Sequence, residues 1–371
     1  MVKDQVRIKS IINDPSLKEK LIQKGCNIDI NQVLQQYNDY IELNKQYDNY
    51  RHEQKITKDI NIGKELKNKL KIIQEEINIL ENTINNIMDY VPNIPHHSVP
   101  IGKDSTENVI VKTNGEIIYN IDHYNILGIN PYTDSAGSRF MYLEKEYALL
   151  ERALYNFMLD ELYNNGFIEY SLPVLLKDYA LTRSRHAPRE SENMFKVEND
   201  QYLIPTTEVS LMNVLHNTDH SNTLKICGLS SCFRKEAGAA GKDTKGLIRV
   251  HEFKKCEMVV IIDAINSYDM LEYMLECSEN LLRKLQIPYR VLLLCTGDTG
   301  FSASKQYDIE IPIGGQWREV ASISNCTNIQ TSTLNIKING KIAHSLNGSA
   351  LPLGRTLASI CEINFKNNII T

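Results

Sequence analysis

A repeat of apolar residues near the start of the chain restricts the possible folds more than any other feature. From residue 66 onward the apolar positions alternate in steps of four and three, at Leu66, Leu70, Ile73, Ile77, Leu80, Ile84 and Ile87. This spacing keeps one seam of an α-helix facing a partner helix, which is the pattern of a coiled coil. The sequence therefore predicts one helix of a coiled coil in this region.

A looser copy of the same spacing comes just before it, at Val33, Tyr37, Tyr40, Asn44 and Tyr47. Ile62 and Gly63 form the expected turn between the two runs, so we predict an antiparallel hairpin over residues 31–89. Helices of about 28 residues would project on the order of 40 Å. One interpretation is a dimerisation coiled coil. The other is a hairpin that folds on itself and leaves its outer faces free for a different partner.

A proline-rich junction follows the hairpin. Pro92, Pro95 and Pro100 force extended backbone and end the helix, which predicts a domain boundary with one domain at 1–96 and a second at 97–371. In the second domain, helical patterns at 142–166 and 268–285 alternate with short strand-like runs. The strand-like runs are 201–204, 258–262, 291–294 and 334–338. This mixture predicts an α+β domain.

The overall composition excludes several classes of protein. With 371 residues, 42% of them hydrophobic, the chain is able to bury a sizeable core, so disorder is excluded as its main state. Neither a bilayer-spanning apolar run nor a targeting segment is visible, and we expect a cytoplasmic protein without a membrane partner. The 8 cysteines are scattered, so we expect reduced thiols and no zinc. A net charge of -5 gives no sign of nucleic-acid binding.

Two segments have the residue types that bind phosphate. Residues 232–260 predict a strand hairpin that presents Arg234, Arg249 and Phe253, where the arginines suit phosphate oxygens and the ring suits a purine. A solvated charged hairpin explains the same pattern equally well. Near the end of the chain, Gly354 and Arg355 open a predicted helix, whose free N–H groups attract anions. No P-loop or dinucleotide-binding fingerprint occurs at these places.

Seven segments in order carry a resemblance to a known family. They read PNIPHHSVPIGKD, GFIEYSLPVLL, LIPTTEVSL, CFRKEAGAAGKDTKGLIRVHEF, CTGDTGFSASKQYDIE, REVASISN and LNGSALPLGRT. Over nearly its whole length the chain resembles a compact bacterial-type seryl-tRNA synthetase, a class II aminoacyl-tRNA synthetase. The resemblance implies an α+β catalytic domain at 97–371 with an antiparallel sheet of six to seven strands flanked by helices. It also implies that residues 1–96 form a tRNA-binding domain with a coiled-coil arm.

The resemblance assigns an ATP site. It implies that Arg234 contacts the α-phosphate, Glu236 the adenine edge, Arg249 and Arg355 the γ-phosphate, and that Phe253 stacks on the base. Arg234 and Arg355 are the implied catalytic residues. Glu319 and Ser322 match the pair that coordinates Mg²⁺, which prefers oxygen ligands.

The resemblance also assigns a serine site. Thr206 and Glu208 would hold the ammonium group, and Glu257, Asn347 and Ser349 would complete the pocket near the side chain. Arg234 is also implied to belong to the serine site. Taken singly, Thr206 and Glu208 are equally typical of a helix N-terminus, and both interpretations stay open. The implied reaction forms seryl-adenylate and then transfers serine to the 3′ end of tRNA(Ser). We interpret His186, His251 and His344 as structural or solvent-facing.

The resemblance also implies that the arm binds tRNA and that the protein is a dimer. Acidic residues outnumber basic ones in the hairpin, yet the bases cluster around its expected tip, where we predict salt-dependent contacts with tRNA(Ser). These tRNA-binding candidates are Lys55, Lys58, Lys64, Lys67, Lys69 and Lys71. Residues 157–176, with Pro173, match the class II motif that packs across a two-fold axis and imply a homodimer.

Three departures from the family pattern leave an alternative open. Residues 183–187 read RSRHA where the family usually has a G-T-G-Q-type loop, Ala321 replaces a usual serine, and positions 331–333 lack a basic pair. The alternative is a paralogue with reduced or no tRNA charging, acting on a carrier protein or as a structural protein. The complete set of motif arginines favours an active ligase.

Overall fold

The computed structural model describes residues 2, 4–127, 133–187, 189, 191–237, 246–366 and 369–370, the last pair and residues 133, 134, 365 and 366 by their backbone only. The Gly/Ala loop expected at 238–245 and Pro188 lie outside the described residues. The chain divides into two compact units, Met1–Ile94 and Pro95–Thr371. Each unit is described by itself.

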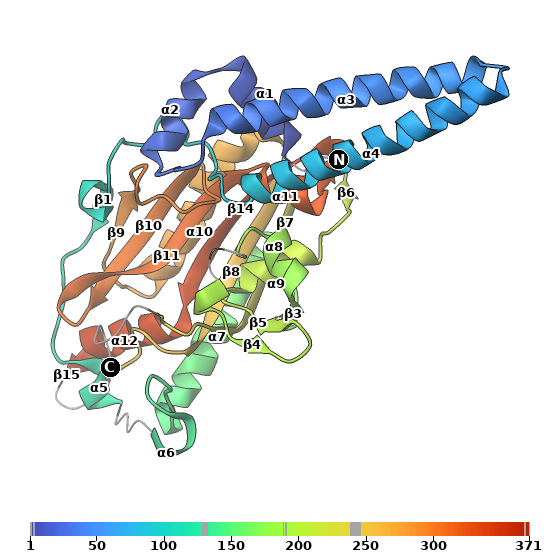
Figure 1. Cartoon of the computed structure of the whole chain (residues 1–371). Helices are drawn as coiled ribbons and strands as arrows, with labels where there is room; N and C mark the ends of the chain where they lie inside the picture. The colour runs from blue at the N-terminus through green and yellow to red at the C-terminus, as the bar shows by residue number, and fades with distance from the viewer. Residues whose placement is uncertain are drawn as a thin grey trace. The chain divides into compact units, whose positions relative to one another are not determined.

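The first unit contains the helical arm predicted from the apolar repeat. Two short helices, α1 (Gln5–Asn13) and α2 (Ser16–Gln23), precede the long helices α3 (Ile30–Ile56) and α4 (Ile60–Met88). The long helices run side by side as a hairpin (Figure 1). The buried seam of α4 is formed by Leu66, Leu70, Ile73, Ile77, Ile84 and Met88. The coiled-coil arm is therefore confirmed, and it folds on itself.

The turn of the arm lies earlier than we predicted from Ile62 and Gly63. Helix α3 ends at Ile56, and Asp59 caps α4 by accepting hydrogen bonds from the backbone N–H groups of Asn61 and Ile62. Gly63 donates its own N–H to the carbonyl oxygen of Asp59 at 2.9 Å and is already helical. An aspartate at the N-cap satisfies N–H groups that have no partner within the helix, so it determines the start of α4 more strongly than an isolated glycine does.

The second unit is built on an eight-stranded sheet in the order β1-β9-β10-β11-β14-β8-β7-β2 (Figure 1). The strands are β1 (Val109–Asn114), β2 (Ile168–Glu169), β7 (Leu224–Phe233), β8 (Glu252–Ile262), β9 (Tyr289–Leu293), β10 (Lys305–Ile313), β11 (Gln316–Thr327) and β14 (His344–Pro352). All neighbours are antiparallel except β2 and β7. The sheet thus exceeds the expected six to seven strands by a short parallel edge strand, which a long crossover connects to β7.

The alternation of side chains along the strands produces two different faces. On β8, Cys256 and Met258 enter the main hydrophobic core, whereas Lys255 and Glu257 line a cavity. The core is completed by helices α7 (Lys145–Asn164), α10 (Ser267–Lys284) and α12 (Leu353–Asn364). Because successive residues of a strand point to opposite faces, the same strands supply the apolar core and the polar cavity.

Smaller elements surround the main sheet. A three-stranded sheet contains β3 (Leu175–Lys177), β4 (Lys196–Val197) and β5 (Gln201–Leu203), and another contains β6 (Asp219–His220), β12 (Lys337–Ile338) and β13 (Lys341–Ile342). A two-stranded ribbon is formed by β15 (Phe365–Lys366) and β16 (Ile369–Ile370). The short helices are α5 (His123–Ile126), α6 (Thr133–Ala136), α8 (Asp178–Arg183), α9 (Thr207–Asn213) and α11 (Ile329–Leu334).

The strand predicted at 334–338 is only partly correct. Leu334 ends α11, Asn335 adopts a left-handed conformation with φ 52°, and β12 begins at Lys337. Leu334 and Ile336 are both buried in one apolar cluster, so the alternation that suggested a strand spans a helix end and the strand after it. Asparagine tolerates the left-handed conformation and frequently terminates helices.

Two further observations concern the membrane and the thiols. Among the residues that the structure describes, no helix is long and apolar enough to cross a bilayer. All eight cysteines fall within that part of the chain, where each is buried and none forms a disulfide.

Candidate active site

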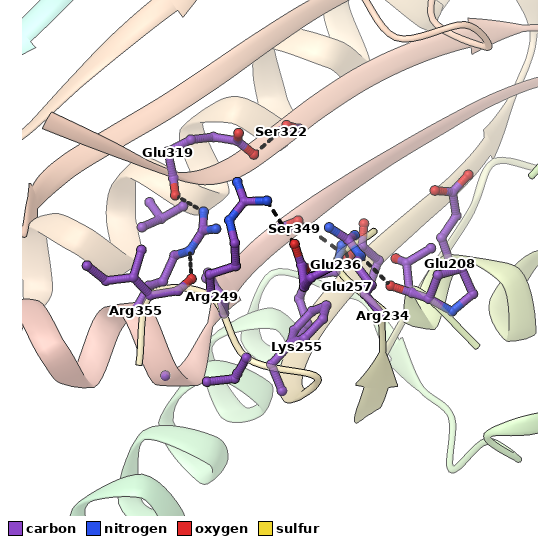
Figure 2. A pocket seen from close by; sticks show the side chains of 18 of the residues that line it. Glu208, Arg234, Glu236, Arg249, Lys255, Glu257, Glu319, Ser322, Ser349 and Arg355 are labelled. Carbon is purple, nitrogen blue, oxygen red and sulfur yellow. Dashed lines mark hydrogen bonds and ion pairs between the residues drawn. The ribbon is translucent and has the colours of Figure 1, made fainter. Parts of the chain in front are cut away.

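A cavity of about 450 Å³ lies on the polar face of the main sheet (Figure 2). All the residues predicted to bind serine, ATP or Mg²⁺ line it: Thr206, Glu208, Arg234, Glu236, Arg249, Phe253, Glu257, Glu319, Ser322, Asn347, Ser349 and Arg355. They come from the start of α9, the β7–β8 connection, the strands β8, β11 and β14, and the start of α12. The fold thus gathers into one cavity a set of residues that spans 150 positions of sequence.

Arg249 and Arg355 lie toward one end of the cavity, away from Glu208 (Figure 2). Arg355 donates from Nε to the carbonyl oxygen of Ile248 at 2.9 Å and from its terminal nitrogen to the carbonyl oxygen of Glu319. Arg249 donates to Glu236 Oε2 at 2.8 Å. Burial lowers the pKa of Arg355, an effect that Glu319 opposes and the charges of Arg234 and Arg249 reinforce. Mutual repulsion of buried cations is relieved by an anion, so this end suits phosphate.

Arg234 lies beside an aromatic ring. Its guanidinium carbon is 5.1 Å from the ring centroid of Phe253, and its Nε donates to the carbonyl oxygen of Pro205 at 3.1 Å. The antiparallel pairing of β7 with β8 aligns Cys232 with Phe253, which brings the arginine and the ring together. A planar cation next to an aromatic face forms a surface on which a flat base and a phosphate can bind together.

Oxygen ligands cluster near Glu319. Ser322 Oγ lies 3.3 Å from Glu319 Oε1 and donates to Asp308 Oδ1 at 2.7 Å. Burial and the nearby charge of Glu319 raise the pKa of Asp308 to about 8. This donor set fits Mg²⁺, which takes one or two protein oxygens and completes its shell with water and substrate phosphates. Within the described residues, no group of three or more His, Cys, Asp and Glu side chains is arranged to hold a metal ion.

Glu208 lies at the opposite end and is heavily hydrogen-bonded. Its Oε1 accepts from Gln330 Nε2 at 2.6 Å and from Asn347 Nδ2 at 2.8 Å, while Oε2 lies 3.6 Å from His186 Nε2. Burial acts to raise the pKa of Glu208, but His186, Gln330 and Lys255 together hold that pKa below its ordinary value. The carboxylate is therefore ionised at neutral pH and suits an ammonium group.

Thr206 occupies the N-cap position of α9 but makes no capping hydrogen bond with its side chain. Its hydroxyl oxygen is buried and has no hydrogen-bond partner among the described residues. A buried hydroxyl without a partner is costly, and a bound polar ligand would remove that cost. The geometry therefore supports a ligand contact more than a capping role.

Glu257 is almost fully buried beside a lysine. Lys255 Nζ lies 2.7 Å from Glu257 Oε2, and Ser349 Oγ donates to the same oxygen at 3.4 Å. Burial raises the pKa of Glu257. Lys255 acts to lower this pKa, whereas the charge of Glu208 raises it further. The middle of the cavity is therefore lined by polar side chains that bind one another.

Sequence reasoning missed several residues of this site. Lys255 and His186 line the cavity, whereas Gln330 and Asp308 support residues that do. The solvent-facing interpretation of His186 is wrong, because its side chain is only 12% exposed and faces Glu208, whereas the structural one fits this position. The altered loop at 183–187 was the available signal for it.

The other two histidines are structural, as interpreted. His251 Nδ1 lies 3.0 Å from the carbonyl oxygen of Arg234. His344 Nδ1 lies 2.9 Å from Ser267 Oγ, and burial lowers the pKa of His344 to about 4. Neither histidine lines the cavity.

Comparison with known proteins identifies the family. Residues 194–364 match the class II tRNA synthetase core domain (G, H, P, S and T). A serine–tRNA ligase of Ehrlichia ruminantium (strain Welgevonden) is 40% identical over 332 residues, which cover 83% of this chain and 77% of the relative. The chain belongs to the serine–tRNA ligase family. Members of this family are ATP-dependent ligases of class II.

The similarity covers nearly the whole chain, including the arm. A serine–tRNA ligase of Thermodesulfovibrio yellowstonii is 36% identical over 390 residues, covering 94% of this chain and 92% of the relative. The crystal structure of seryl-tRNA synthetase from Pyrococcus horikoshii complexed with ATP superposes with a TM-score of 0.84 at 33% identity, covering 97% of this chain and 94% of that one. These similarities do not favour the alternative of a paralogue without tRNA charging.

Proposed function

We propose that this cavity forms seryl-adenylate from L-serine and ATP and that the enzyme then transfers the seryl group to the 3′ end of tRNA(Ser). The proposal rests on one observation above all. A single cavity holds Arg249 and Arg355 toward one end, the ionised carboxylate of Glu208 toward the other, and Arg234 between them. Such an arrangement would bind an amino acid and a nucleoside triphosphate end to end. The reacting carboxylate and α-phosphate would then meet between the two ends.

The first step needs no side-chain base. A carboxylate oxygen of serine attacks the α-phosphorus, an oxygen–phosphorus bond forms, and the bond to the β-phosphate breaks to release pyrophosphate. Arg234 would stabilise charge on the α-phosphate, and Arg249 and Arg355 would hold the γ-phosphate. Phe253 would stack on adenine, with Glu236 at the edge of the base. Catalysis then comes from positioning and from stabilisation of phosphate charge.

Glu319 and Ser322 would hold Mg²⁺, with Asp308 oriented toward Ser322 Oγ. When bound there, the ion neutralises charge on the phosphates of ATP.

The amino-acid end would select serine through hydrogen bonds. Glu208 and Thr206 would hold the ammonium group, and Asn347, Glu257 and Ser349 would surround the hydroxymethyl group. Bound alanine would leave such buried polar groups without a partner. A site built to bind a hydroxyl group therefore discriminates strongly against alanine. The walls around the β-carbon would exclude threonine.

The second step would use the helical arm and a second copy of the chain. The lysines around the arm tip would supply positive charge for tRNA(Ser), and residues 157–176 would form a two-fold interface of a homodimer. Membership of a family that acts in translation supports a cytoplasmic location.

The test is amino-acid-dependent exchange of pyrophosphate into ATP, measured with serine, alanine, threonine and cysteine in parallel. We expect exchange with serine alone. Arg355→Ala should lower the exchange rate by about 10²–10³-fold, the typical cost of removing a transition-state charge contact. Arg152→Ala, at an exposed arginine of α7, is the matched control and should leave the rate unchanged. No exchange with any amino acid would contradict the proposal.

A further inference from the structure

His123 is a buried histidine outside the cavity. It is the first residue of α5 and only 1% exposed, and it is not among the residues that line the cavity. Both of its ring nitrogens nevertheless have specific partners. A histidine of this kind either only fills space or holds another segment in place.

The partners determine the tautomer of His123. Nε2 accepts a hydrogen bond from the backbone N–H of Leu247 at 2.9 Å, and a backbone N–H can only donate. Nε2 therefore carries the lone pair, and the proton is on Nδ1, which lies 2.7 Å from Glu362 Oε1. A proton on Nε2 would place two donors against each other. The imidazole is thus neutral and oriented by the carboxylate.

Glu362 is itself held in place. Its side chain is fully buried, its Oε1 also accepts the backbone N–H of His123 at 3.2 Å, and its Oε2 accepts the N–H of Gly314 at 2.6 Å. Gly314 lies in the turn between β10 and β11. The carboxylate therefore anchors His123 to α12, the helix that carries Arg355, and to the sheet.

The segment bound by His123 is part of the cavity wall. Leu247, Ile248 and Arg249 all line the cavity, and the carbonyl oxygen of Ile248 accepts the hydrogen bond from Arg355 Nε. Gly246 shows how closely this segment approaches the ring, because a Cβ atom there would lie 1.9 Å from His123 Nε2. Gly246 also has a positive φ of 71°, which favours glycine.

We propose that His123 is a positioning residue for the nucleotide end of the site. Its Nε2 holds the N–H of Leu247, so that Ile248 and Arg249 stay in register with Arg355 on α12. The inference rests on the proposed role of Arg249 and Arg355 in binding ATP. It assigns to His123 an effect on ATP and not on serine, whose proposed ammonium contact Glu208 lies at the other end of the cavity (Figure 2).

Two substitutions separate the two hydrogen bonds of the ring. His123→Gln can place its amide oxygen near the position of Nε2 and keep an acceptor for Leu247. His123→Asn can place its amide nitrogen near Nδ1 and keep the donor to Glu362, but it leaves the N–H of Leu247 without an acceptor. Tyr124→Phe, which removes a hydrogen bond to Asp122 in the same segment, is the matched control.

The experiment is serine-dependent pyrophosphate exchange with KM measured separately for ATP and for serine. We expect His123→Asn to raise KM for ATP by about tenfold or more, consistent with one buried donor left unpaired, with KM for serine changed less than twofold. The KM for ATP of His123→Gln should stay within about threefold of that of the unaltered protein. The KM for ATP of Tyr124→Phe should equal that of the unaltered protein. Equal effects of Asn and Gln, or equal changes in both KM values, would overturn the inference.

A second variant covers the case in which His123→Asn does not fold. Gly246→Ala displaces the same segment from the other side and should also raise KM for ATP selectively, whereas an unchanged KM for ATP in a folded Gly246→Ala protein would contradict the inference. Absence of exchange in the unaltered protein would overturn the proposed function and this inference with it. Normal exchange with no selective effect on ATP would overturn the inference alone.

Discussion

The carboxylate of Glu208 shows how neighbours determine the charge of a buried residue. Gln330 and Asn347, which lie 122 and 139 positions away in sequence, donate to one of its oxygens. The other oxygen faces His186 at 3.6 Å. Burial alone would favour the neutral acid, so these partners keep Glu208 able to bind an ammonium group.

We predict that His186→Ala weakens serine binding selectively. Removing the imidazole leaves Glu208 Oε2 without its neighbour, which should raise KM for serine by about tenfold, equivalent to roughly 1.4 kcal/mol, and change KM for ATP less than twofold. The measurement is pyrophosphate exchange at varied serine concentration.

The control for this prediction is His186→Gln, which keeps a hydrogen-bond donor near Glu208 and should retain most of the affinity for serine. If His186→Ala left KM for serine unchanged, the role of this histidine in supporting Glu208 would be wrong.

At the scale of elements, the arm combines an acidic composition with a basic tip. Two exposed acids also have a structural role, because Asp29 and Asp59 cap α3 and α4. Among the basic candidates, Lys69 forms an ion pair with Glu65 at 2.8 Å. Lys58 lies in the turn itself, and Lys64, Lys67 and Lys71 are exposed on the first half of α4. The positive charge therefore concentrates close to the turn.

We predict that the double variant Lys64→Glu, Lys67→Glu lowers kcat/KM for tRNA by roughly 10- to 100-fold at physiological salt and reduces the dependence on salt concentration, because each phosphate contact releases counterions. Pyrophosphate exchange should stay within twofold. The measurements are aminoacylation at several salt concentrations and exchange in parallel.

A matched control reverses two exposed lysines of the second unit, Lys177→Glu and Lys341→Glu. It changes the net charge by the same amount and should affect aminoacylation much less. Equal loss of aminoacylation and exchange in the arm variant would contradict the division of work between arm and cavity.

At the scale of the whole molecule, the segment expected to form a two-fold interface carries exposed apolar side chains. Within residues 157–176, Tyr163 on α7 is 69% exposed and Ile168 on the edge strand β2 is 53% exposed. Large apolar side chains that stay exposed together on neighbouring elements are typical of a surface covered by a partner.

We predict that the protein sediments at twice the mass of one chain and that Tyr163→Asp with Ile168→Asp shifts it to a monomer, because burying two carboxylates in an interface is unfavourable. Analytical ultracentrifugation measures both. Ile265→Asp replaces an apolar residue that is 91% exposed outside this segment, and this control should remain dimeric. A monomeric unaltered protein at micromolar concentration would contradict the prediction.

The local apolar repeat was enough for the arm, whereas the list of polar site residues came from the resemblance to the family. The four-three repeat predicted α4, and the residues that the family motifs named all line one cavity. The errors were local as well. The turn at Ile62 was wrong and the strand at 334–338 was only partly correct, because an N-cap aspartate determines where α4 begins and a left-handed asparagine follows the end of α11.

The sequence by itself determined which residues are helical in the arm and which residue types the site offers, because helix periodicity and strand alternation depend on neighbours a few positions apart. Only the tertiary structure decided the order of the strands, the partners of Glu208 and Glu257, and the contact of His123 with Leu247, 124 positions away. Those contacts, and the charge states that follow from them, depend on the packing of distant segments, which no local pattern encodes.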